Sequence, residues 1–313
     1  MITKELTYKK AFEIKKELLK RKIRERQMLL DSAYSTNSRL LAIDNELASL
    51  GASLALTALS GDTEKIDKIK AQSQLLSAEK SIILKKCGVE DIEYDCLICG
   101  DTGYINGKVC DCVKKIANKI AMQELSAMMP LDECRFENFD LKYYSGDAKK
   151  RMTSILKLCK EYVLNFNPKT SSNLLFLGEP GLGKTHLTLA IVSGVIDKGF
   201  MPVYAPAENL FNAIQKEKFD GENKGAFDNM QNSDLLVIDD LGTEMATSFT
   251  KSALYNLINT RLLTKKPTII NTNLTLKEIE SIYSPRIASR LIGNFNANKF
   301  LGLDIRQQKN LGK

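Results

Sequence analysis

A glycine-rich stretch in the middle of the chain constrains the fold more than any other feature. Residues 178–185 read GEPGLGKT and fit the pattern G-x-x-x-x-G-K-[ST] at every fixed position. An apolar run precedes this stretch, and apolar residues at helical spacing follow it. Strand, glycine loop and helix in this order place backbone N–H groups and a helix N-terminus around a phosphate. We therefore predict binding of a nucleoside triphosphate, ATP, through Gly178, Glu179, Pro180, Gly181, Leu182, Gly183, Lys184 and Thr185.

Two side chains of this loop and two carboxylates further along the chain have expected roles. Lys184 would reach the β- and γ-phosphates, and the Thr185 hydroxyl would hold Mg²⁺. A second apolar run, 235–238, ends in Asp239 and Asp240, which is the Walker B pattern. Asp239 would hold Mg²⁺ through water, and Asp240 would orient or deprotonate the attacking water. The alternatives are a turn that binds nothing and a strand with a polar end, and the presence of both motifs disfavours them.

Polar residues also end the next predicted strand. Asn273 is at the tip of this strand, with Asn271 as the alternative, and either could position the attacking water near the γ-phosphate. Strands that alternate with helices in this way form a doubly wound parallel sheet. The predicted fold class of residues 131–313 is therefore α/β, with a five-stranded parallel sheet and flanking helices. The five predicted strands are residues 173–177, 201–205, 235–240, 267–273 and 300–304.

The first 90 residues are predicted to be helical. Amphipathic stretches at residues 4–30 and 36–60, and a third from residue 63 to Cys87, predict a small bundle or a helical hairpin. Residues 1–26 hold ten Lys and Arg against four Glu, whereas the remaining 287 residues carry 35 basic and 34 acidic side chains. The basic helix is either a partner-binding face or an ordinary solvated surface, and the charge alone does not decide between them.

Four of the seven cysteines have the spacing C-x2-C-x10-C-x-C, namely Cys96, Cys99, Cys110 and Cys112. Four thiolates held by glycine-containing turns are typical of a closed, structural Zn²⁺ site with tetrahedral geometry. Cys87 is a possible substitute ligand, and a metal-free cysteine cluster is the alternative to a zinc knuckle. Residues 91–130 are therefore predicted to form a zinc knuckle followed by a linker helix.

The composition excludes several classes of protein. No apolar run approaches the roughly 18 residues that a membrane-spanning helix needs. The first residues lack the apolar segment of a secretory signal, so we expect a cytoplasmic protein with no membrane partner. In that compartment, cysteines are more often metal ligands or buried thiols than disulfides.

Together, these motifs resemble those of AAA+ ATPases of the DnaC/DnaI type, the bacterial replicative helicase loaders, and of their relative IstB, the transposition helper ATPase. The four-cysteine knuckle behind a helical region makes the chain most similar to DnaI, since IstB-like proteins generally lack it. The resemblance covers roughly residues 135 to 310. It rests on residues 178–185, 235–242, 272–274, 286–291 and 302–306.

The resemblance implies roles for further residues. Asn273 is similar to the residue called sensor 1, which lies near the γ-phosphate. Arg290 resembles the arginine finger that reaches ATP on a neighbouring subunit, and Arg286 could take its place. Arg306 resembles the sensor 2 arginine, which contacts the γ-phosphate in its own subunit. Asp240 stands where many AAA+ proteins have the longer Glu, which implies slow intrinsic hydrolysis.

The resemblance also implies partners. The N-terminal region would bind the hexameric replicative helicase, and the AAA+ domain would self-associate and contact single-stranded DNA. In the polar stretch 216–224, Lys216, Lys218 and Phe219 suit phosphate contact and base stacking, although an exposed loop is equally compatible with these residues. The expected function is ATP-dependent loading of that helicase at replication initiation or restart. The alternatives are an IstB-like transposition helper ATPase acting on duplex DNA and an ATP-dependent scaffold without turnover.

Overall fold

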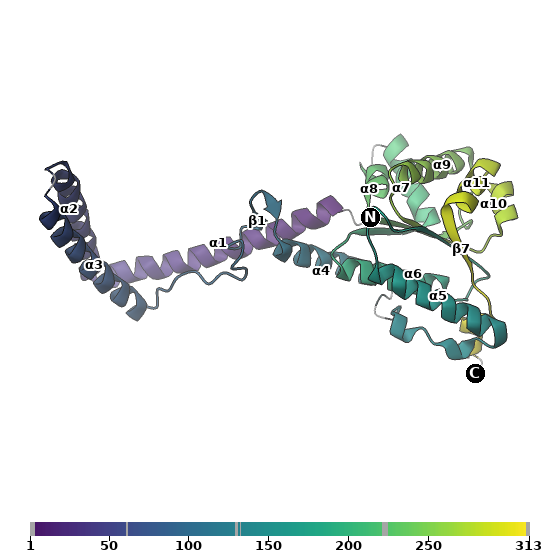
Figure 1. The fold of residues 1–313 in the computed structure, drawn as a ribbon, viewed down its shortest axis with the longest axis horizontal. Helices are drawn as coiled ribbons and strands as arrows, with labels where there is room; N and C mark the ends of the chain where they lie inside the picture. Colours follow the sequence, from purple (N-terminus) through teal and green to yellow (C-terminus); the bar gives the residue numbers. More distant parts are fainter. Residues whose placement is uncertain (1–3, 61, 129–130, 132, 221–224, 311–313) are drawn as a thin grey trace. The chain divides into compact units, whose positions relative to one another are not determined.

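The computed structural model describes residues 4–60, 62–128, 131, 133–220 and 225–310 (Figure 1). The chain divides into two compact units, one made of residues 12–112 and the other of residues 1–11 together with 113–313. The boundaries predicted near residues 90 and 130 stay predictions. Among the described helices, none combines the length and the apolar character needed to cross a membrane.

The N-terminal helices form as the apolar spacing predicts. They are α1 (Lys4–Thr36), α2 (Ser38–Ser60) and α3 (Thr63–Lys86). The Asp62 side chain accepts a hydrogen bond from the Lys65 backbone N–H and so caps the first turn of α3. Arg39 of α2 makes a bidentate pair with Glu79 of α3, both N···O distances being 2.8 Å. This contact lies beside the buried Leu40 and helps hold α2 against α3.

A short hairpin follows these helices. Its strands are β1 (Tyr104–Ile105) and β2 (Lys108–Val109), which pair antiparallel. The two turn residues, Asn106 and Gly107, have φ values of 50° and 75°, the left-handed conformation that a tight hairpin turn requires. Helix α4 (Asp111–Met128) begins two residues after β2.

The C-terminal part contains the predicted parallel sheet, with strand order β4-β5-β6-β3-β7. All four neighbouring pairs are parallel, which confirms the predicted five-stranded α/β fold. Because β3, β5 and β6 are neighbours, their carboxyl ends meet at one edge, where open α/β sheets bind ligands. The strands are β3 (Asn173–Leu177), β4 (Pro202–Pro206), β5 (Leu235–Leu241), β6 (Thr268–Thr272) and β7 (Phe295–Lys299).

Helices cover both faces of this sheet (Figure 1). In β5, Leu236 and Ile238 face one layer while Leu235 and Val237 face the other, because successive side chains of a strand alternate. The first layer holds α7 (Ala207–Phe219), α8 (Ala226–Asn232), α9 (Ser248–Leu263), α10 (Leu276–Ile282) and α11 (Pro285–Asn294). The second holds α4, α5 (Gly146–Leu164) and α6 (Lys184–Asp197). The remaining short elements are the 3₁₀ turns Phe136–Asn138 and Leu141–Tyr143 and helix α12 (Ile305–Asn310).

The position predicted for the last strand was wrong. The strand is β7, and residues 300–304 instead continue past the end of the sheet. The sequence of β7, FNANK, is mostly polar because the strand lies at the sheet edge and pairs only with β3. Phe300, which suggested a buried strand, packs its ring 5.1 Å from that of Phe176. Phe300, an apolar residue that lies next to the sheet, was therefore mistaken for the start of a strand.

Candidate nucleotide site and metal centre

The glycine-rich loop lies between the end of β3 and the start of α6. Lys184 is buried, and its Nζ donates hydrogen bonds to the carbonyl oxygens of Gly178 and Glu179 at 2.6 and 2.9 Å. Burial lowers the pKa of Lys184, although the carboxylates of Asp240 and Asp239 favour its charged form. The lysine thus crosses the mouth of its own loop, where a bound phosphate would replace the two carbonyl oxygens as its partner.

Two glycines of the loop are required by both backbone conformation and space. Gly183, the residue before α6, has a φ of 85°, and an added Cβ would lie 2.8 Å from Cε2 of Phe139. Gly178 has a φ of 149°, and its Cβ would lie 2.8 Å from the carbonyl oxygen of Phe300. Side chains at these positions would be strained and would displace neighbouring segments.

Asp239 is held rigidly at the end of β5. Its side chain is buried, and its Oδ1 accepts hydrogen bonds from Asn271 Nδ2 at 2.5 Å and from Thr185 Oγ1 at 3.3 Å. Its Oδ2 accepts from the Tyr204 hydroxyl. Asn271 is fixed in turn by Thr188, which donates to the amide oxygen at 3.0 Å. The loop threonine and the carboxylate predicted to share Mg²⁺ are therefore in direct contact.

Asp240 points differently from its neighbour. It has a φ of 52°, a left-handed conformation that is uncommon for residues other than glycine, and its side chain is exposed toward the cavity in front of the loop. Desolvation and the adjacent Asp239 carboxylate raise the pKa of Asp240, while Lys184 and Arg306 oppose this shift. The structure thus separates the two carboxylates, with Asp239 buried beside Thr185 and Asp240 facing the space where a phosphate would lie.

The cavity has a volume of about 660 Å³, within the range usual for small-molecule sites. Residues 180–186, from the loop and the first turn of α6, line it. Asp240, Asn273 and Arg306, all predicted from the sequence, also line it. Asn271 does not, since its side chain is buried against Asp239. The two asparagines that the sequence left as alternatives thus occupy different places.

Residues 133–143 form a second wall of the cavity, and no sequence motif predicted this role. The Tyr144 hydroxyl donates to the carbonyl oxygen of Leu182 at 2.9 Å. Nε2 of His186 lies 2.8 Å from the carbonyl oxygen of Arg135. The ring of Phe139 lies 5.5 Å from that of His186. These contacts attach the wall to the loop, and the cluster of aromatic residues is the only sequence signal that could have indicated them.

The two arginines with predicted phosphate roles lie apart. Arg306 lines the cavity from α12. Arg290, on α11, is not among the residues that line it and is half-buried against α9. Its guanidinium donates to the Tyr255 hydroxyl at 2.7 Å and to Asn259 Oδ1 at 3.1 Å. Arg286 is exposed on the same helix.

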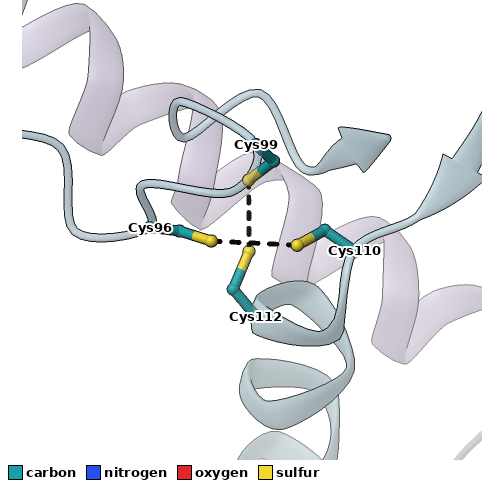
Figure 2. Close-up of side chains that lie close together, drawn as sticks. All are labelled: Cys96, Cys99, Cys110 and Cys112. Atoms are coloured by element: carbon teal, nitrogen blue, oxygen red, sulfur yellow. Dashed lines mark hydrogen bonds between the residues drawn. The ribbon is translucent and has the colours of Figure 1, made fainter. Parts of the chain in front are cut away.

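The four predicted cysteine ligands come together (Figure 2). All four Sγ atoms lie within 4.8 Å of one another. Cys96 and Cys110 are separated by 3.8 Å between sulfurs, and Cys99 and Cys112 by 3.5 Å. Zinc–sulfur bonds of about 2.3 Å in a tetrahedron put the sulfurs about 3.8 Å apart, so the cluster fits this metal. Cys87, the possible substitute ligand, packs instead in the apolar cluster that contains Leu40.

The surroundings of the cysteines act on their charges in different directions, since burial and the neighbouring thiols raise the pKa of Cys112. Hydrogen bonds from the Cys99 backbone N–H and thiol lower the pKa of Cys96 to about 7, which favours the metal-binding form. Asp101 is buried, which opposes its ionisation, but a hydrogen bond from Lys15 and the backbone N–H groups of Asp95 and Cys96 outweigh this and lower its pKa to about 2. Asp101 and Lys15 also belong to this centre, but the spacing of the cysteines in the sequence could not have predicted either residue.

Comparison with known proteins finds a family model that matches the part of the chain containing the nucleotide-binding motifs. The model of the IstB-like ATP binding protein family matches residues 111–292, more than half of the chain. The replicative helicase loader DnaC of Buchnera aphidicola subsp. Baizongia pistaciae (strain Bp) is 30% identical over 166 residues, which are 51% of this chain and 64% of that protein. DnaC of Escherichia coli (strain K12) is 28% identical over 176 residues, 54% of this chain and 68% of that protein.

A crystal structure of the DnaC helicase loader is similar, with a TM-score of 0.47 and 25% identity, covering 53% of this chain and 98% of that one. A crystal structure of DnaI has a TM-score of 0.47 and 19% identity, covering 56% of this chain and 93% of that one. Most of the N-terminal helical region and three of the four clustered cysteines precede the residues that the family model matches. On the match over residues 111–292, and with the nucleotide-binding motifs in place, this chain belongs to the family of IstB-like ATP binding proteins.

Proposed function

We propose that this protein is an ATP-dependent loader of a hexameric replicative helicase onto single-stranded DNA. The observation that carries the proposal is the likeness of its ATP-binding part to proteins named replicative helicase loader DnaC, at up to 30% identity. The cysteine knuckle and the helical N-terminal region favour this function over a transposition helper, because neither is needed for binding a nucleotide.

The proposed reaction is hydrolysis of ATP. Lys184 would contact the β- and γ-phosphates, while Thr185 and Asp239 would hold Mg²⁺, which would neutralise developing phosphate charge. Asp240 would activate the attacking water, with Asn273 fixing its position. Both side chains line the cavity in front of the loop, which supports these roles.

Self-association is proposed from the two arginines. Arg306 lines the cavity of its own chain and would contact the γ-phosphate there. Arg290 is not among the residues that line it, so it would serve ATP on a neighbouring subunit. An arginine supplied by a neighbour makes hydrolysis depend on assembly, because the charge of the transition state is neutralised only across the interface.

Single-stranded DNA is proposed to bind beside α7 and α9. Phe219 is 65% exposed, and its ring lies 5.5 Å from that of Phe249. Lys218 Nζ lies 5.7 and 5.5 Å from the centres of these two rings, next to a pocket of about 540 Å³. Aromatic rings with a nearby cation suit base stacking and phosphate contact. Part of the stretch predicted to contact DNA, residues 221–224, lies outside the described residues.

The helicase is proposed to bind the hairpin of α2 and α3. No charged residue occurs from residue 47 to 61, although α2 is largely exposed. Leu56, Leu59 and Leu75 are 71%, 87% and 73% exposed. Exposed apolar side chains on one helical hairpin, here from both α2 and α3, are typical of an interaction surface.

A pull-down with purified replicative helicase tests the proposal. We expect the full chain with ATP to capture the helicase and Leu59→Glu to reduce capture at least tenfold. Leu263→Glu, at a leucine of α9 that is 77% exposed, is the matched control and should leave capture unchanged. If the wild-type chain captures no helicase but binds duplex DNA more tightly than single strands, the transposition helper is the better interpretation.

Mixing variants tests turnover and the role of Arg290. Arg290→Ala chains keep every proposed catalytic residue of their own nucleotide site. Asp240→Asn chains lose one of those residues but keep the arginine that they would offer to a neighbouring subunit. We expect each alone to be nearly inactive as an ATPase and a mixture to recover activity, since mixed assemblies contain complete sites. A mixture of Arg306→Ala and Asp240→Asn chains should recover no activity, because every chain in it lacks a residue of its own site. If wild type, Lys184→Ala and Asp240→Asn are equally inactive with DNA and helicase present, the scaffold without turnover is favoured.

A further inference from the structure

A buried ion pair joins α1 to the loop that carries Cys96 and Cys99. Lys15 and Asp101 lie 86 residues apart in the sequence, and their side chains are 5% and 1% exposed. Lys15 Nζ donates a hydrogen bond to Asp101 Oδ1 at 2.5 Å. Burying two charges costs solvation free energy, which is recovered only when the pair has good geometry and further hydrogen bonds. Losing either partner would deprive the other of its close buried counter-charge.

The same carboxylate also holds the backbone next to the metal ligands. Asp101 Oδ1 accepts a hydrogen bond from the Cys96 N–H at 2.9 Å, and Oδ2 accepts one from the Asp95 N–H at 2.9 Å. Asp101 adopts a φ of 60°, the left-handed conformation that turns its side chain back over its own loop. One buried carboxylate therefore closes the loop from residue 95 to 101 and fixes the start of the first ligand pair.

A second lysine of α1 reaches the same loop. Lys22 Nζ lies 2.7 Å from Asp95 Oδ1, 3.4 Å from Asp101 Oδ2 and 2.8 Å from the carbonyl oxygen of Glu93. Part of the basic charge of the first 26 residues is thus paired within residues 12–112 and does not form an open cationic surface.

We infer that Lys15 and Asp101 are positioning residues of the metal centre, so that zinc binding by the four cysteines and docking of α1 on their loop stabilise each other. The inference rests on the proposed binding of zinc. Lys15, at 2.5 Å, compensates the buried charge with which Asp101 orders the Cys96 backbone, whereas Lys22 makes a longer contact of 3.4 Å, and the metal requires an ordered Cys96. Because linkage is reciprocal, the metal should favour the docked helix by the same factor as the docked helix favours the metal.

Zinc competition with a chromophoric chelator tests one direction of this coupling in the full chain. Lys15→Met keeps the length of the side chain but removes its charge. We expect it to raise the zinc dissociation constant about 10- to 100-fold, as is usual for residues that orient metal ligands. Lys16→Met, at the adjacent exposed lysine, should match the wild type. Asp101→Asn should weaken binding to a similar degree, and the double variant by little more than either single one, because both remove one interaction.

Hydrogen exchange tests the other direction. In the wild type, removing zinc should speed amide exchange in residues 12–26, and in Lys15→Met the metal should change this exchange much less. ATP binding by each variant checks that residues 113–313 remain folded, and Lys15→Arg, which keeps the charge, should restore much of the zinc affinity.

Three results would overturn the inference. They are equal zinc affinity for Lys15→Met and Lys16→Met, unchanged exchange in α1 after chelation, and no zinc binding by the wild type. Only the last would also reject the proposed zinc centre.

Discussion

His186 is the only histidine of the chain and directly follows the phosphate-binding loop. Its ring is half-buried beside Phe139, and Nε2 donates to the carbonyl oxygen of Arg135, which can only accept. Burial lowers the pKa of His186 below 6.5, and the hydrogen bond to Arg135 opposes this shift without cancelling it. The fold therefore favours the neutral ring.

The direction of this shift predicts a pH dependence. With a lower pKa in the folded protein, His186 binds a proton more readily when the chain is unfolded. The stability it contributes is present above about pH 6.5 and is lost as the pH falls through the folded pKa. We expect the free energy of unfolding of residues 113–313 to fall from pH 7 to 5.5, and His186→Gln to flatten this decrease. Urea titrations at several pH values measure it, and equal slopes for both proteins would contradict the assignment.

At the scale of single residues, the motifs identified the main chemical groups but not what holds them. Thr185, Asp239 and Asp240 were predicted because loop and strand motifs are contiguous in sequence. Tyr204 was missed because its contact with Asp239 depends on β4 lying beside β5, which no local pattern encodes. Asn271 was left as an alternative to Asn273 because a strand end alone does not reveal which side chain faces the cavity.

At the scale of elements, two glycines serve opposite purposes. Gly51 lies within α2, and an added Cβ there would meet no atom within 4 Å. Gly183 precedes α6 in a left-handed conformation, and its Cβ would collide with Phe139. The first glycine weakens its helix, whereas the second makes a helix start possible around a phosphate.

Replacing these two glycines with alanine should therefore have opposite consequences, with a gain in stability at Gly51 and a loss of ATP binding at Gly183. We expect Gly51→Ala to raise the free energy of unfolding of residues 12–112 by about 0.5–1 kcal/mol, since alanine has the higher helix propensity. Gly183→Ala should instead weaken binding of a fluorescent ATP analogue at least tenfold. Urea titration and fluorescence titration measure the two effects, and normal ATP binding by Gly183→Ala would show that the wall carrying Phe139 moves easily.

At the scale of the whole molecule, the division into two units predicts separate responses to two ligands. The cysteine cluster belongs to residues 12–112, and the nucleotide cavity to residues 113–313. Ligands that bind only a folded unit stabilise it, by about 2.7 kcal/mol at a hundred times the dissociation constant. The metal and the nucleotide should therefore stabilise different parts of the chain.

Thermal unfolding with each ligand added or removed tests this separation. We expect a zinc chelator to lower the transition of residues 12–112 and to leave ATP affinity unchanged. ATP with Mg²⁺ should raise only the other transition. Both ligands shifting one common transition would show that the two units unfold together.

The sequence alone determined the nucleotide loop, the two carboxylates near the end of β5 and the four cysteines, because each depends on residues close together in the chain. It also predicted the five parallel strands, although it misplaced the polar edge strand β7, whose position depends on pairing with β3. Only the tertiary structure decided which partners the buried charges have. The contacts of Asp239 with Asn271 and of Asp101 with Lys15 join segments 32 and 86 residues apart. Such partners are selected by packing and by the high cost of an unpaired buried charge, neither of which leaves a local pattern.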